Sequence, residues 1–145
     1  MLPVFLLCAA ILVTLVVGNL LSHAGAEPGS LETDDRGFVD SKVRCEAPES
    51  AVAFGRTEQS LVAICVDRDG HYEYRGARLG DDAVLTVVAE PTVPGEYFAQ
   101  KDGVTYTVTA KELIIKSDEY VSTEPVLQSG APPLLAVEVP TPLPR

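Results

Sequence analysis

The hydrophobic and polar positions divide the chain into two differently patterned parts. Residues 2–21 are apolar and contain no charged side chain. A run of this length is typical of a membrane-spanning helix or an export signal. From residue 42 onward, short apolar or alternating runs are separated by turn residues at regular intervals. Runs of this kind predict β-strands, and no extended helical periodicity follows residue 26.

Six or seven short strands are predicted in the second part. The continuous β-branched run over residues 60–66 is typical of a strand buried on both faces. Asp69-Gly70 and Asp102-Gly103 favour two-residue hairpins, because both positions tolerate a positive φ. The other expected strands are 71–75, 83–88, 96–100, 104–109, 111–116 and 120–123. The predicted fold class is all-β, a small antiparallel sandwich or barrel-like domain preceded by an N-terminal hydrophobic helix.

The N-terminal run supports two alternatives. Ala24 and Ala26 are the small residues that a signal peptidase requires, with cleavage expected before Glu27. No Lys or Arg precedes the run, however, and about 20 residues are enough to cross a bilayer. The segment is therefore either a cleaved signal peptide or a retained anchor. Both alternatives place the rest of the chain outside the cytoplasm.

Four regions follow from these patterns. Residues 1–26 are the signal peptide or anchor, and residues 27–41 are polar and acidic, as a linker would be. Residues 42–128 form the β domain. Residues 129–145 contain five prolines and are expected to form an extended tail. Whether this tail docks on the domain stays open.

Cys45 and Cys65 are the only cysteines of the exported part, and a pair outside the cytoplasm predicts a disulfide. Closing this loop would stabilise the domain by roughly 3 kcal/mol in the chain-entropy model. A zinc site would need more nitrogen and sulfur ligands than the single His71 of this part supplies. The acidic run at residues 67–70 is too short for a calcium loop. Neither a metal nor a cofactor is predicted.

The formal net charge of −10 disfavours nucleic-acid binding, because an acidic chain repels phosphate. No nucleophile motif surrounds any Ser or Cys, so an enzyme is not predicted. One hydrolase alternative would bring Ser60 and His71 together across the first hairpin. Tyr74, Arg75 and Arg78 are the candidate contact patch, since exposed Tyr and Arg suit protein recognition.

Several segments of the β domain resemble small exported or membrane-anchored β-domain proteins of actinobacteria. The segments that carry the resemblance are residues 51–55, 60–65, 72–76, 103–108 and 124–125. The resemblance implies an exported β domain and carries over no catalytic residue.

The function expected from the sequence is that of an exported or membrane-anchored envelope protein that binds another envelope protein without catalysis. One alternative is an accessory subunit of a membrane complex, held in the bilayer by residues 2–21. The other is a small extracytoplasmic hydrolase.

Overall fold

The computed structural model describes residues 29–130, in which the chain is all-β and antiparallel. The all-β, antiparallel class is therefore confirmed for this range. Within it, no helix has the length and apolar character needed to cross a membrane. The predicted N-terminal helix, the cleavage residues Ala24 and Ala26, and residues 131–145 of the predicted tail lie outside the described residues.

Nine strands form one sheet, and two form a separate hairpin. In spatial order the sheet contains β10 (Val121–Pro125), β9 (Glu112–Lys116), β8 (Val104–Val108), β7 (Tyr97–Lys101), β6 (Leu85–Pro91), β5 (Tyr72–Arg78), β4 (Ser60–Val66), β3 (Ser50–Arg56) and β11 (Gln128–Gly130). The hairpin consists of β1 (Thr33–Asp34) and β2 (Gly37–Phe38). The strands expected from the sequence do not include β1, β2, β3 or β11.

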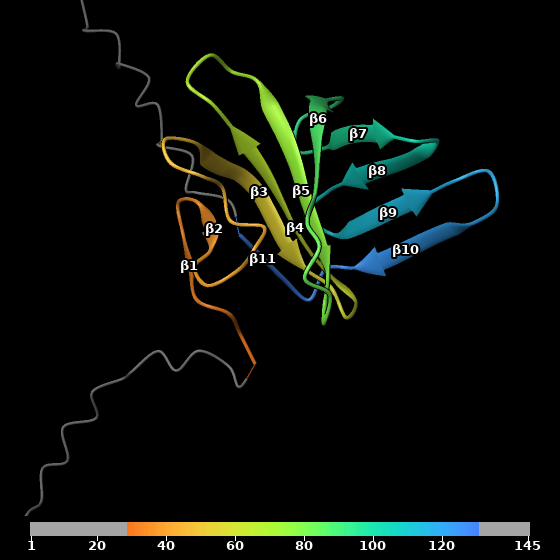
Figure 1. The fold of residues 1–145 in the computed structure, drawn as a ribbon, viewed down its shortest axis with the longest axis horizontal. Coiled ribbons are helices and arrows are strands. Elements are labelled where there is room, and N and C mark those ends of the chain that lie inside the picture. Colours follow the sequence, from red (N-terminus) through yellow and green to blue (C-terminus); the bar gives the residue numbers. More distant parts are fainter. Residues whose placement is uncertain (1–28, 131–145) are drawn as a thin grey trace, which may run out of the picture.

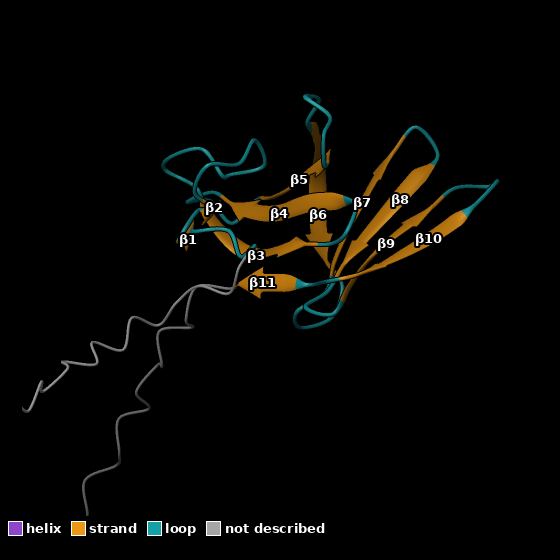
Figure 2. Cartoon of the chain, turned by 90° about the horizontal axis from the view of Figure 1, so that it is seen from below, coloured by secondary structure: helices purple, strands orange, loops and turns teal. Residues whose placement is uncertain are grey.

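The sheet curls into a half-barrel. Strands β10 and β11 lie at opposite edges, yet only two residues separate them in the chain. The Val126 N–H donates to the Lys111 carbonyl next to β9 (2.8 Å), and the Leu127 N–H donates to the Arg56 carbonyl of β3 (2.7 Å). The chain thus passes directly from one edge to the other. Figures 1 and 2 show the result, with β3, β4 and β5 running across the hairpins β7–β8 and β9–β10.

The concave face holds the larger hydrophobic core. Its buried members come from six consecutive strands of the sheet, β4 to β9, so the curl brings distant strands into contact. They are Val62, Ile64, Tyr74, Ala89, Ala99, Val108, Leu113 and Ile115. Burial of these side chains stabilises the curled sheet, because apolar area removed from water contributes roughly 25 cal/mol per Å².

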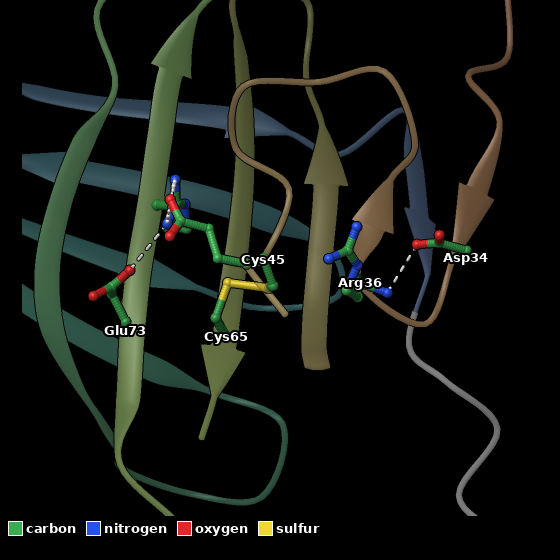
Figure 3. Close-up of a disulfide and its surroundings, with 7 residues drawn as sticks. Asp34, Arg36, Cys45, Cys65 and Glu73 are labelled. Atoms are coloured by element: carbon green, nitrogen blue, oxygen red, sulfur yellow. Dashed lines mark hydrogen bonds and ion pairs between the residues drawn. A yellow bond between two sulfur atoms is a disulfide. The ribbon is translucent and has the colours of Figure 1, made fainter. Parts of the chain in front are cut away.

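The convex face of β3 and β4 is covered by the segment that precedes β3. Phe38 and Val43 of this segment are fully buried, and the Phe38 ring meets Phe54 edge-on at 5.1 Å. The Cys45–Cys65 disulfide fastens the segment to β4 (Figure 3). Within residues 29–41, which the sequence predicts as a linker, β1 pairs with β2 and Phe38 is buried, whereas residues 29–35 are exposed. The polar composition around Phe38 gives no sign of this packing.

The two predicted hairpin turns differ. Asp102 (φ 50°) and Gly103 (φ 79°) form the expected two-residue turn between Lys101 and Val104. At the other turn, only Gly70 has a positive φ (84°), and the Asp67 N–H donates to the His71 carbonyl (3.1 Å). This is a three-residue loop, so the expectation of a two-residue turn at Asp69-Gly70 was wrong.

Pro125, which is expected to end the seventh strand, is the last residue of β10. Because β10 is an edge strand, the missing N–H of proline leaves no bond of the sheet unmade. A proline also makes this edge a poor template for another strand.

Candidate functional site

A hollow of ≈ 370 Å³ opens on the concave side of the half-barrel. It lies between the end of β5, the loop from β5 to β6, and the strands β8 and β9. The residues that line it are Ser60, Tyr74, Gly76, Ala77, Arg78, Asp81, Ala83, Val84, Leu85, Tyr106, Ile115 and Tyr120. Three tyrosines and several aliphatic side chains make its wall mostly apolar, which is usual for small-molecule sites.

Tyr74 forms one wall of the hollow and is only 3% exposed. Its ring stacks on that of Tyr106, with the centroids 4.9 Å apart. Burial, together with the nearby Tyr106 and Glu124, raises the pKa of the Tyr74 hydroxyl well above its ordinary value. The hydroxyl therefore stays protonated at any physiological pH.

Gly76 makes room for Tyr74, because the Tyr74 side chain leans along β5 over the glycine. A Cβ added to Gly76 would lie 2.6 Å from Cζ and 2.7 Å from Cε1 of Tyr74, and closer still to its hydroxyl oxygen. Real carbon atoms do not approach so closely, so any other residue would push the ring out of its stack.

Gly76→Ala is therefore expected to lower the free energy of unfolding by about 2 kcal/mol, as overpacking a buried site does. Urea denaturation measures the change. Gly80→Ala is unsuitable as a control, because Gly80 has a positive φ (83°). Adding Tyr74→Leu should restore part of the loss if the ring is the obstacle. A double variant no more stable than Gly76→Ala would contradict this reason.

The floor of the half-barrel carries a buried polar network. Glu124 is 3% exposed, and its Oε1 accepts a hydrogen bond from Arg78 Nη1 (2.9 Å). Its Oε2 accepts one from the hydroxyl of Thr57, which is fully buried (2.7 Å). The Thr57 oxygen in turn accepts the N–H groups of Gln59 (3.1 Å) and Ser60 (2.8 Å). We call this the Thr57–Glu124–Arg78 network.

The network joins three parts of the fold, namely β10, the turn between β3 and β4, and the end of β5. It therefore ties β10, at one edge of the sheet, to the β3–β4 turn and to the end of β5 that lines the hollow. Neither Glu124 nor Thr57 stands out in the sequence as a candidate site residue. Nothing in the run Ser122-Thr123-Glu124-Pro125 marks one carboxylate as buried, because its partners come from distant parts of the chain.

The three residues of the candidate contact patch do not lie together. Tyr74 and Arg78 line the hollow on the concave side. Arg75 lies on the opposite face of β5, where its side chain is 13% exposed and faces the carboxylates of Glu46 and Glu73, each at 3.4 Å. The structure thus brings two of the three to one site.

The residues of the hydrolase alternative are separated. In the sheet Ser60 is paired with Arg78, whereas His71 lies in the turn beyond the other end of β4. A seven-residue strand spans about 20 Å, far more than the reach of a hydrogen bond. His71 Nδ1 instead lies 3.0 Å from Asp67 Oδ2.

Asp67, Asp69 and His71 place possible ligand atoms within 4.8 Å of one another. Asp67 Oδ1 is already bonded to the N–H groups of Asp69 (2.8 Å) and His71 (2.9 Å). These bonds build the turn, and Asp69 and His71 are exposed. The turn accounts for the arrangement without a metal.

This turn predicts a pH effect. The hydrogen bond and charge of Asp67 raise the pKa of His71, and bonds donated by the His71 backbone and ring lower the pKa of Asp67. The pair stabilises the turn while His71 is protonated and Asp67 ionised. Its contribution is therefore lost as pH rises through the raised pKa of His71, and again as pH falls through the lowered pKa of Asp67.

Asp67→Asn is accordingly expected to bring the His71 pKa down toward 6.5. An NMR titration of the His71 ring measures it. Asp69→Asn is the matched control and should lower this pKa less, because Asp69 acts only through its charge. Equal effects of the two variants would contradict the assigned hydrogen bond.

No protein-family model, no curated protein and no solved structure matches the chain. The candidate site therefore depends on the geometry of this structure alone.

Proposed function

We propose that the domain is a non-catalytic binding module that works outside the cytoplasm and receives its ligand in the hollow. The observation that carries the proposal is the wall formed by Tyr74, Tyr106 and Tyr120 beside Arg78. Tyr and Arg combine large contact area with polar groups and are enriched where proteins bind partners. The separation of Ser60 from His71 favours binding over hydrolysis.

The extracytoplasmic location is supported by two independent features. The disulfide between Cys45 and Cys65 is typical of oxidising compartments. The apolar run at residues 2–21 would deliver the chain there. The ligand is then expected on another component of the envelope, such as an envelope protein. An uncleaved run would make the domain an accessory subunit of a membrane complex.

Site-specific photo-crosslinking tests the proposal in cells of the source organism. Tyr120, which is 49% exposed at the rim of the hollow, is replaced by benzoylphenylalanine. Illumination should give a discrete adduct. Adding Ala83→Trp should abolish it, because Ala83 is an exposed residue of the wall and a Trp there would fill the hollow.

Val93→Trp is the matched control, since Val93 is 57% exposed and does not line the hollow. It should leave the adduct unchanged. Failure to form an adduct, or an adduct that persists with Ala83→Trp, would overturn the proposal. The intact mass of the adduct also shows whether residues 2–21 are retained, which separates the secreted module from the accessory subunit.

A further inference from the structure

The hydroxyl groups of two mostly buried side chains are open to the hollow and have no hydrogen-bond partner in the described range. Ser60 is 4% exposed and Tyr74 is 3% exposed, and both line the hollow. No residue of the described range, 29–130, is hydrogen-bonded to either hydroxyl. Neither hydroxyl oxygen is one of the enclosed side-chain atoms that lack a partner, so both can be reached from the hollow and can donate to or accept from a ligand there.

Arg78 offers further donors at the same place. Its Nη1 is held by Gln59 Oε1 (3.0 Å) and Glu124 Oε1 (2.9 Å). Its Nε and Nη2 have no hydrogen bond to any residue that the structure describes, and the side chain is 46% exposed. Glu124 therefore fixes the guanidinium while leaving its other edge free for an oxygen acceptor.

The charges around the hollow favour an uncharged ligand. Glu124 balances Arg78, and Asp81 adds a negative charge to the lining. An anion would approach Asp81 and a chain with a net charge of −10, whereas a cationic group carries no acceptor for the free donors of Arg78. A neutral ligand with several oxygen atoms avoids both penalties and still satisfies the free donors.

The tyrosine rings add a preference for shape. Tyr106 and Tyr120 present ring surface to the hollow next to Leu85 and Ile115. A compact ring with an apolar face and polar edges would contact this wall and also reach the hydroxyl groups. The volume of ≈ 370 Å³ is near the lower end for ligand sites, which suits a small ligand or the end of a chain.

We propose that the hollow binds an uncharged sugar ring, whose hydroxyl groups bond to Ser60, Tyr74 and Arg78 and whose C–H face packs on the tyrosines. This inference rests on the proposed binding function and names the ligand class. The sugar is either a free saccharide or a unit of an envelope glycan, since both present the same ring.

Three rings that differ in charge test the ligand class. The purified full chain is titrated with N-acetylglucosamine (neutral), glucosamine (cationic) and glucuronate (anionic), together with the neutral methyl glycosides of glucose, galactose and mannose. Because the chain contains five Tyr and no Trp, tyrosine fluorescence reports binding directly. At least one neutral ring should bind about tenfold more tightly than both charged rings, a difference of about 1.4 kcal/mol.

Tyr74→Phe and Ser60→Ala test the contacts. Each should weaken binding of the neutral ring about fivefold, as expected for one hydrogen bond lost. Neither should reduce stability, because neither hydroxyl is bonded within the described range. Tyr97→Phe is the matched control, since Tyr97 packs on Tyr72 and does not line the hollow. It should leave the affinity unchanged.

Tighter binding of glucuronate or glucosamine, or an affinity unaffected by Tyr74→Phe and Ser60→Ala, would overturn the sugar inference. So would the absence of binding by every neutral ring. If the crosslink at Tyr120 still depends on an open hollow, the binding function stands and only the ligand class is wrong. If the crosslink fails as well, both proposals fall.

An envelope glycan, rather than a free saccharide, is identified when glycosidase treatment shifts the mass of the Tyr120 adduct.

Discussion

Replacing Glu124 with alanine is expected to lower the free energy of unfolding by about 3 kcal/mol. The change removes the charge-assisted bond from Arg78 and the acceptor of the buried Thr57 hydroxyl. A hydrogen bond to a charged group contributes about 1.5–3 kcal/mol, and an orphaned buried hydroxyl costs about 1–3 kcal/mol. Arg78 is half-exposed and returns to water, so the full penalty of an unpaired buried charge does not apply.

The effect is measured by urea denaturation of the variant beside two controls. Glu119→Ala makes the same change at an exposed residue just before β10 and should alter stability by less than about 0.5 kcal/mol. Glu124→Gln should lie between wild type and Glu124→Ala. Its amide oxygen can still accept from Arg78, but its N–H₂ meets a Thr57 oxygen that already accepts two N–H groups. Equal stability of the two alanine variants would show that the network does not hold the half-barrel closed.

The sequence predicts a strand well where the signal lies in a few neighbouring residues. The run at residues 60–66 coincides with β4, and Asp102-Gly103 marks a hairpin whose two residues both have positive φ. Such signals depend on side-chain periodicity and turn chemistry within a few residues. These local signals are enough to predict the all-β class, although they do not show which strands pair when the strands are distant in sequence.

What the sequence misses depends on tertiary contacts. Strand β11 reads Gln128-Ser129-Gly130, which has no strand propensity, and it forms because β3 offers unpaired backbone hydrogen-bonding groups beside it. The Gln128 side chain also bonds to both backbone groups of Leu31 (2.9 and 2.8 Å), 97 residues away in the chain. Contacts of that separation leave no local pattern.

The same reasoning applies to the candidate site. Tyr74 and Arg78 were recognised from residue type, whereas Arg75 was grouped with them only because it is adjacent in sequence. Alternation along β5 places odd and even residues on opposite faces, so this grouping could have been refined from the strand assignment. Which face curls inward to form the hollow follows only from the closure between β10 and β11.

The second large effect is expected from the disulfide. Cys45→Ala combined with Cys65→Ala should lower the free energy of unfolding by about 3 kcal/mol, the chain-entropy value for a loop with a sequence separation of 20. The segment that precedes β3 should unfold more readily than the rest of the domain. The bond fastens the segment carrying Phe38 and Val43 to β4, and both sulfur atoms are buried in that smaller core.

Hydrogen exchange measured by mass spectrometry separates this local effect from a global one. In the double variant, residues 33–49 should lose protection while β5 to β9 keep most of theirs, because the concave core contains neither cysteine. Wild type treated with a thiol reductant should behave like the variant, which excludes an effect of the alanines themselves. Unchanged protection of residues 33–49 would mean that Phe38 and Val43 suffice to hold the segment. The two hydrophobic clusters would then act as a single cooperative unit, and the hollow on the concave face would depend on the covering of the convex one.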